Sequence, residues 1–243
     1  QRELGELPEA IKTALILIAL EESAKHYLLL AQIQKQAGKI QDSLFTLKKA
    51  AQIDPEMEKF VMETLIEHDD IDSAFVLVEK ILHKNPYDEN ALFIKSKILL
   101  KQKKIEEAKI TLYTLVYLPP KNQKTQELAS FALASLLFNE KKYAEAEGFF
   151  NQVLKINPQK DEAAIQKAFI LVFKKDFTQA KEAFTYLKNK GVQEKALLAE
   201  IYYGLALIEY NFKEHEKARA YAVKTLEILN QHKGAFKILN SLQ

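Results

Sequence analysis

The stretch KKYAEAEGFFNQV, residues 141–153, opens with two lysines and then places Tyr143, Ala146 and Phe150 at intervals of three and four residues. Residues at these intervals lie on one face of an α-helix. A small residue on that face lets a second helix approach closely. We therefore predict an amphipathic helix here that packs against a neighbouring helix through Ala146.

Five further stretches align with this one without gaps: GKIQDSLFTLKKA from Gly38, DDIDSAFVLVEKI from Asp69, KKIEEAKITLYTL from Lys103, KDFTQAKEAFTYL from Lys175 and KEHEKARAYAVKT from Lys213. Each has a polar pair, then a small residue, then an apolar residue four positions later. The small residues are Ser43, Ala74, Ala108, Ala146, Ala180 and Ala218. Their successive separations of 31, 34, 38, 34 and 38 positions indicate an internal repeat.

A second helix in each repeat is predicted from the residues that precede each stretch. Most of these segments also offer a small residue at the matching position, in Ala31, Met62, Ser96, Ala134, Ala168 and Ala206. Proline follows four of the units at a constant distance from the small position, at Pro55, Pro86, Pro120 and Pro158. Because proline lacks an amide hydrogen and restricts the preceding residue, it ends the helix. Each repeat is therefore predicted to be a pair of helices.

This pattern resembles the tetratricopeptide repeat family. The resemblance implies an all-α, right-handed superhelical solenoid of antiparallel helix pairs, with residues 1–243 forming a single domain of about 14 helices. The predicted repeats cover residues 24–57, 55–88, 89–122, 127–160, 161–192 and 199–230. The sequence departs from the family pattern at several first-helix positions, held by Gln34, Glu58, Lys95, Ser130, Lys167 and Glu209.

The two ends of the chain extend the repeat. Residues 1–22 fit a truncated repeat, and residues 232–243 fit a capping helix that covers the last repeat. Phe236, Leu239 and Leu242 are predicted to form the apolar face of this helix.

The amino-acid composition agrees with a helical protein and restricts the classes of partner that it could bind. Glycine and proline number six each, cysteine is absent, and the net charge is +2. The absence of cysteine excludes disulfides and thiolate metal sites, and so small a charge does not favour nucleic acid as a partner. The longest apolar run, residues 13–20, is too short to cross a membrane. We expect no direct membrane insertion and a soluble protein, cytoplasmic or periplasmic.

The first ten residues begin with glutamine and contain three glutamates, which does not fit a signal peptide. We expect a piece of a longer protein or a processed chain. Motifs for catalysis are also missing: the sequence has no glycine-rich phosphate loop, no HExxH and no GxSxG. No two of the five histidines share a helix face at ligand spacing. We therefore predict no catalysis, no cofactor and no metal.

The family resemblance implies that the first helix of each repeat lines a groove that binds a protein or peptide. The positions expected to face this groove are Phe93, Lys97, Lys101, Phe131, Ser135, Phe138, Ile165, Phe169, Phe173, Tyr203, Leu207 and Asn211. Charge varies along the chain: residues 54–80 hold nine acidic and two basic residues, and residues 89–126 hold eight basic and three acidic ones. Such neighbouring patches would orient a charged ligand.

The leading hypothesis is a scaffold that binds a peptide, a helix or a folded protein. Self-assembly through an open helix face at Ile11, Leu15 and Ile18 is an alternative. Another is a recognition segment of a larger enzyme or of an envelope-assembly or secretion machine. A helical repeat that reads nucleic acid is disfavoured by the acidic second repeat.

Overall fold

The computed structural model describes the backbone of residues 2–242 and the side chains of residues 7–242. Over this part of the chain the secondary structure is entirely helical, with 14 α-helices and one 3₁₀ segment. The predicted all-α repeat of helix pairs is confirmed. The helices are α1 (Arg2–Leu20), α2 (Ala24–Gln36), α3 (Ile40–Ile53), η1 (Pro55–Met57), α4 (Glu58–Glu67), α5 (Ile71–Lys84), α6 (Glu89–Lys101), α7 (Ile105–Tyr117), α8 (Gln123–Asn139), α9 (Tyr143–Ile156), α10 (Asp161–Phe173), α11 (Phe177–Lys190), α12 (Lys195–Asn211), α13 (His215–Ile228) and α14 (Lys233–Ser241).

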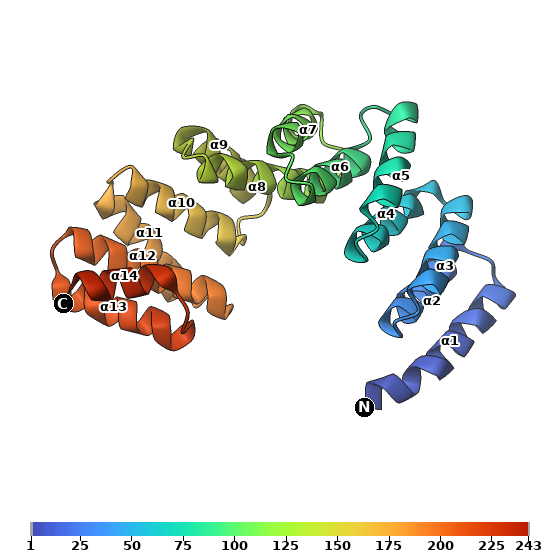
Figure 1. Ribbon diagram of the computed structural model, residues 1–243, viewed down its shortest axis with the longest axis horizontal. Coiled ribbons are helices and arrows are strands. Elements are labelled where there is room, and N and C mark those ends of the chain that lie inside the picture. The colour runs from blue at the N-terminus through green and yellow to red at the C-terminus, as the bar shows by residue number, and fades with distance from the viewer. Residues whose placement is uncertain (1, 243) are drawn as a thin grey trace. The chain divides into compact units, whose positions relative to one another are not determined.

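The chain divides into two compact units, and the single domain expected over residues 1–243 stays a prediction. The first unit runs to Lys121 and holds α1 to α7, and the second starts at Asn122 and holds α8 to α14 (Figure 1). The boundary follows Pro119 and Pro120. Two successive prolines cannot continue α7, and they separate it from the next helix pair.

The small residues that define the repeat are buried in all six pairs. Ser43, Ala74, Ala108, Ala146, Ala180 and Ala218 are each 0% exposed, and their counterparts on the first helices are at most 1% exposed. The apolar residues four positions later are also buried, and Phe150 and Phe184 are among the largest fully buried side chains. The predicted helix–helix contact is thus the centre of every repeat.

The unequal repeat spacings come from the lengths of the first helices. α2, α6 and α10 have 13 residues, while α8 and α12 have 17. The four additional residues add one helical turn, and both spacings of 38 span one of these longer helices. α4 has only 10 residues and lies within the spacing of 31. The differences in length therefore lie in the first helices, and they do not alter the spacing of the packing residues within the second helices.

The turn between the two helices of each pair has the same backbone conformation six times. The first residue of each polar pair has a positive φ, at Gly38, Asp69, Lys103, Lys141, Lys175 and Lys213, with values from 60° to 73°. The next N–H donates to the carbonyl five residues earlier, as from Lys142 to Leu137 at 2.9 Å. This left-handed ending of the first helix satisfies its last carbonyls and reverses the chain.

Acidic residues in the first half of several first helices bind the end of the second helix of their own repeat or the linker that follows it. Glu89 Oε1 accepts the N–H of Lys121 at 2.6 Å, and Glu127 Oε1 accepts Asn157 Nδ2 at 3.3 Å. The same relation joins Asp161 to Lys190 Nζ at 2.5 Å and Glu200 to His232 Nε2 at 3.2 Å. We call these bonds linker clasps.

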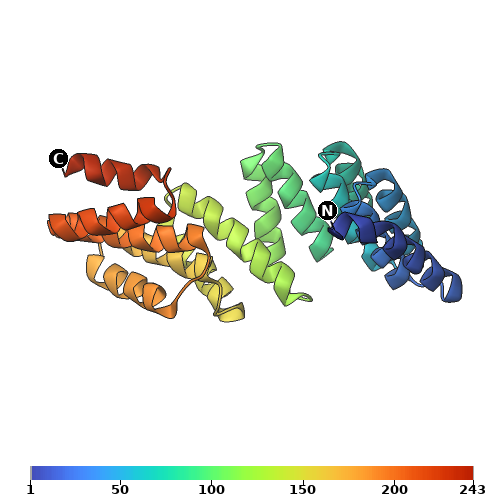
Figure 2. The ribbon, with the colours of Figure 1, turned by 90° about the horizontal axis from the view of Figure 1, so that it is seen from below.

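The predicted capping helix is α14, and it packs on α12 and α13 at the end of the second unit (Figure 2). Its buried face is formed by Ala235 and Ile238, which are 0% and 5% exposed. Phe236, which was expected on that face, is 47% exposed, so this expectation is wrong. Gly234 lies against the ring of Tyr203, next to the buried Ala235.

Candidate partner-binding surface

In the first unit, the three predicted groove residues lie on α6. Lys101 Nζ donates to the carbonyl of Ile66 at 3.0 Å and to Asp69 Oδ1 at 3.1 Å. Its ammonium therefore holds the carboxyl end of α4, where a positive charge is favourable. Lys97 Nζ lies 5.9 Å from the centre of the Phe93 ring. Of these residues, Phe93 and Lys97 are half-buried and Lys101 is exposed.

In the second unit, Phe131 and Ser135 lie on α8 and are half-buried. The Phe131 ring packs edge-on against Phe150 at 5.9 Å, and Lys160 Nζ lies 5.3 Å from its centre. The Ser135 hydroxyl donates to the carbonyl of Phe131 at 2.9 Å. The Phe150 ring thus holds the Phe131 ring in place, and the ammonium of Lys160 lies beside it.

Two residues of α10 that were expected to face a partner lie in the core. Ile165 is 1% exposed and Phe169 is 5% exposed. The Phe169 ring packs edge-on against Phe184 of α11 at 5.0 Å. This corrects the expectation that both side chains are exposed in a groove: they lie in a core cluster that includes Leu205 and Ile208 of α12, so they stabilise the contact between repeats.

On α12, Tyr203 is half-buried between two rings, Phe169 at 6.0 Å and His232 at 4.5 Å. Burial, and secondly the carboxylate of Glu200, raise the pKa of the Tyr203 hydroxyl above its ordinary value. Leu207 is also half-buried, and its carbonyl accepts Asn211 Nδ2 at 2.8 Å. Asn211 is exposed, so of these three residues of α12 only the one at the carboxyl end of the helix lies fully on the surface.

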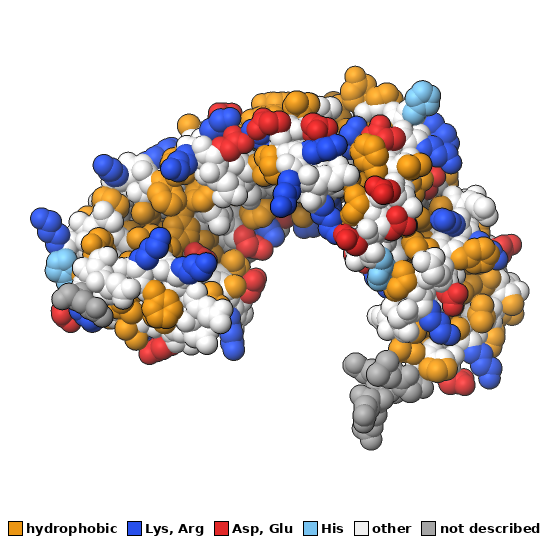
Figure 3. Space-filling view, viewed as in Figure 1, with side chains coloured by type: hydrophobic (Ala, Val, Ile, Leu, Met, Phe, Trp, Pro, Cys, Tyr) orange, Lys and Arg blue, Asp and Glu red, His pale blue; other side chains and the backbone are white. Residues whose placement is uncertain are grey.

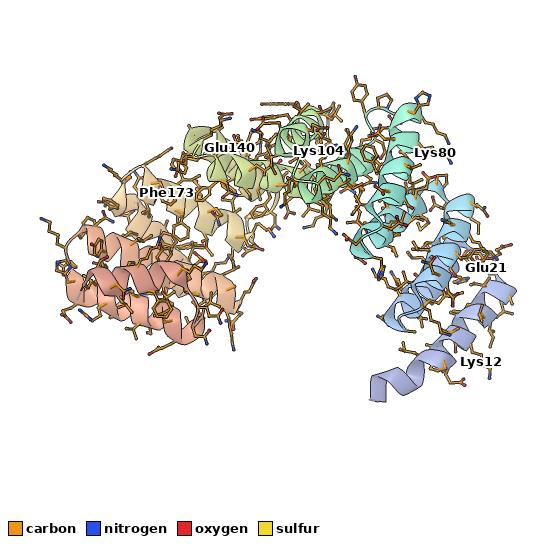
Figure 4. The ribbon with its side chains drawn as sticks, viewed as in Figure 1. Lys12, Glu21, Lys80, Lys104, Glu140 and Phe173 are labelled. Carbon is orange, nitrogen blue, oxygen red and sulfur yellow. The ribbon has the colours of Figure 1, made fainter. Side chains whose placement is uncertain are left out.

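Three rings meet where α8, α9 and α10 end or begin. Phe173 stacks on Tyr143 with ring centres 5.2 Å apart and planes 7° apart, and Phe138 packs edge-on against both rings at 5.7 Å. We call Phe138, Tyr143 and Phe173 the aromatic cluster. Phe173, labelled in Figure 4, is 47% exposed although it is the last residue of a helix that is otherwise largely buried.

Charged side chains surround the aromatic cluster. Lys174, next to Phe173, forms an ion pair with Glu147 of α9. Lys142, next to Tyr143, pairs with Glu140 at 2.9 Å. Hydrophobic and charged side chains are interspersed on the face of the second unit that Figure 3 shows. An exposed ring within a charged rim can pack against an apolar side chain of a partner while the rim excludes water.

The sequence pattern pointed to Phe138 and Phe173 as site residues but to Tyr143 only as a packing residue. Tyr143 occupies the position where other repeats have Ile40, Ile71, Ile105, Phe177 or His215. Its place directly after a left-handed turn brings the ring to the end of the preceding helix. The turn at Lys141 has an aromatic residue in the helix before it, Phe138, and another in the helix after it, Tyr143. This pattern could have predicted the cluster.

Within the part of the chain that the structure describes, no helix is long and apolar enough to span a bilayer. Among the side chains of residues 7–242, no three His, Cys, Asp or Glu gather in a way that could hold a metal ion. The candidate site consists of aromatic and aliphatic side chains with charged neighbours, a composition suited to contact with a polypeptide.

The stacked helix pairs, with buried small residues at each crossing, define a helical-repeat protein. Two stretches of the chain, residues 24–57 and 129–160, match the model of the tetratricopeptide repeat. These two stretches correspond to the first and fourth of the repeats predicted from the sequence.

Solved structures share the fold at low sequence identity. PilF of Pseudomonas aeruginosa has a TM-score of 0.72 and 18% identity, covering 91% of this chain and 98% of its own. PilW, described as a type IV pilus biogenesis factor, has a TM-score of 0.66 and 14% identity over 89% and 98%. YrrB, described as a protein with an unusual peptide-binding site, has a TM-score of 0.64 and 16% identity over 80% and 97%. No curated protein sequence matches the chain.

Proposed function

We propose that this protein is a scaffold that binds a peptide or helix of another protein and performs no catalysis itself. The observation that carries this proposal is the aromatic cluster, in which Phe173 is 47% exposed while its two partner rings hold it in one orientation. A ring that is already ordered loses little conformational entropy on binding, so burying its exposed face favours association.

The chemistry of the proposed partner follows from the surface. The exposed ring requires an apolar or aromatic side chain, and the ion pairs Lys174–Glu147 and Lys142–Glu140 supply both charges at the rim. Phe131 and Lys160 offer a second ring and cation on the same unit. Tetratricopeptide repeats are used for protein binding, and one structural relative, YrrB, is described as having a peptide-binding site.

The test is a screen of the full chain against an array of peptides that contain aromatic and aliphatic residues between charged ones. We expect Phe173→Ala to weaken binding of the selected peptides about tenfold or more, as for an interface hot spot. Tyr186→Ala is the matched control, because Tyr186 is 69% exposed on α11 and outside the cluster. Equal binding by the wild type and Phe173→Ala would contradict this placement.

Self-association is a second candidate, favoured by α1. Leu15, Ile16 and Leu20 are 51%, 52% and 79% exposed on this helix, while the predicted contacts Ile11 and Ile18 are half-buried. Burying three large side chains in a second copy would favour a dimer by the hydrophobic effect. Sedimentation of the chain over a range of concentrations tests this idea. A sedimentation coefficient that does not change with concentration would count against it.

A further inference from the structure

A separate apolar groove lies on the second helices of the first unit. It has a volume of about 760 Å³ and runs between α3 and α5, with α4 as its floor. Val61 and Leu65 of α4 are 2% and 6% exposed, so the floor is apolar and closely packed. Phe45 and Val76 stand on the two walls and are 62% and 69% exposed. Figure 1 shows the helix pairs that supply the groove.

The walls have the spacing of two helix faces. α3 contributes residues 41, 44, 45 and 48, and α5 contributes residues 73, 76, 77 and 80. Each set follows the i, i+3, i+4, i+7 pattern, so each wall is a continuous stripe along one side of its helix. Both helices run antiparallel to α4 and hence parallel to each other. Two parallel ridges over an apolar floor match the shape of a third, amphipathic helix.

The two ends of the groove carry opposite charges. Asp70 and Asp72 lie where α5 begins, and Lys48 and Lys80, the latter labelled in Figure 4, lie toward the other end. Among the side chains of residues 7–242, those of Lys48, Asp72 and Lys80 form no ion pair. These charges are therefore available to a ligand, unlike the paired lysines of the aromatic cluster.

We propose that this groove binds an amphipathic helix of a partner protein, antiparallel to α3 and α5. Helices are stabilised by acidic residues in their first turn and basic residues in their last turn. Such a helix places its acidic end beside Lys48 and Lys80 and its basic end beside Asp70 and Asp72. The lining from residue 41 to 48 is about 10 Å long, which corresponds to about two turns of the bound helix.

The amino acids at one position of the repeat also differ between this face of the first unit and the equivalent face of the second unit. The exposed position two residues after the small residue holds Phe45, Val76 and Ile110 in the first unit. In the second unit it holds Gly148, Glu182 and Ala220. The apolar wall is therefore a property of the first unit rather than of the repeat. The groove uses second helices, so its test is independent of the aromatic cluster on the other unit.

The experiment uses the full chain and three synthetic peptides, each about four helical turns long so that charged turns flank the apolar contact. Binding is measured by fluorescence anisotropy. The first peptide is helical, with an apolar stripe, glutamates in the first turn and lysines in the last. The second has the same stripe with the charges exchanged, and the third has two central prolines that prevent a helix. We expect the first peptide to bind at least tenfold more tightly than the other two.

Variants of the chain locate the binding. Val76→Glu is expected to weaken binding of the first peptide at least tenfold, because it places a charge on the apolar wall. Ile110→Glu is the matched control: Ile110 has the same position in its repeat, is 66% exposed and lies outside the groove. The double variant Lys48→Glu/Lys80→Glu is expected to lose the preference for the first peptide, because both ends of its groove are acidic and each peptide then has one matching and one opposing end.

Four results of the peptide-binding measurements would overturn the proposal. These are no binding of the first peptide, equal binding of the first and second, equal weakening by Val76→Glu and Ile110→Glu, or binding of the proline peptide as tight as that of the first. Concentration-dependent dimerisation that Val76→Glu abolishes would also overturn it, because it would assign the groove to a second copy of the chain. Circular dichroism of each variant verifies that its helices are intact.

Discussion

Gly204 of α12 lies directly against the ring of Phe184 of α11. A Cβ atom at position 204 would lie 2.6 Å from both Cε atoms of that ring, which is closer than such atoms can approach. Phe184 is itself 0% exposed and has no room to move away. The crossing of α11 and α12 thus depends on the absence of a side chain at one position, a constraint that the small residues of the repeat pattern do not include.

We expect Gly204→Ala to destabilise the second unit by about 1–3 kcal/mol, since overpacking costs more than the gain in helix propensity. Gly148→Ala is the control, because nothing lies within 4 Å of a Cβ atom there. That substitution should stabilise its helix by about 0.5–1 kcal/mol. Urea unfolding followed by circular dichroism measures both effects, and a stabilising Gly204→Ala would show that the interface is looser than described.

The six left-handed turns make a second prediction. Lys175 has a φ of 63° and Gly38 has a φ of 73° at equivalent positions. A residue with a Cβ atom is strained in this conformation by about 1 kcal/mol. Lys175→Gly should therefore raise the free energy of unfolding by up to about 1 kcal/mol, and Gly38→Ala should lower it by a similar amount. Opposite signs in thermal melts are the expected result, and two changes of the same sign would contradict it.

Phe169 and Phe173, on consecutive turns of α10, should respond differently to truncation. Phe169 is buried against Phe184, so Phe169→Ala is expected to cost about 3–5 kcal/mol of stability. Phe173 is 47% exposed, so Phe173→Ala should cost about 1 kcal/mol. Chemical denaturation separates the two residues. If both substitutions cost the same, the distinction between packing and partner-binding surface on this helix is wrong.

Glu209 provides a prediction about a buried charge. It is 2% exposed, and its Oε1 atom lies 2.7 Å from Lys181 Nζ. Lys181→Met would leave the carboxylate buried without its counterion, at a cost of about 2 kcal/mol given that the lysine is partly exposed. Adding Glu209→Leu should restore most of the lost stability, because it removes the charge. A double variant as unstable as Lys181→Met would indicate another partner for Glu209.

The second helices were predictable because one rule, small residue then large residue four positions later, is repeated six times and is local to each helix. The structure was needed to explain some of the first-helix positions at which the sequence departs from the family pattern. The hydroxyl of Thr46 donates to Gln34 at 2.8 Å and Lys181 pairs with Glu209, so each polar residue has a partner on another helix.

The exposure of the candidate site was harder to predict. Ile165 and Phe169 share a helix with Phe173, yet only Phe173 is exposed. Which side of a first helix is covered depends on how the next pair packs, and this depends on contacts between residues a whole repeat apart. The division after Pro120 is likewise a matter of long-range packing that the period of the repeat does not report.

The linker clasps have a consequence for synthesis of the chain. Each of the four bonds joins residues that are 29 to 32 positions apart, roughly one repeat. A nascent segment therefore needs only its own repeat and the following linker to leave the ribosome before the clasp can form. Because chain closure over so short a distance has a modest entropic cost, helix pairs can form one after another during translation. Each helix pair would then fold soon after its own residues are synthesised, and little apolar surface would stay exposed until distant parts of the chain are made.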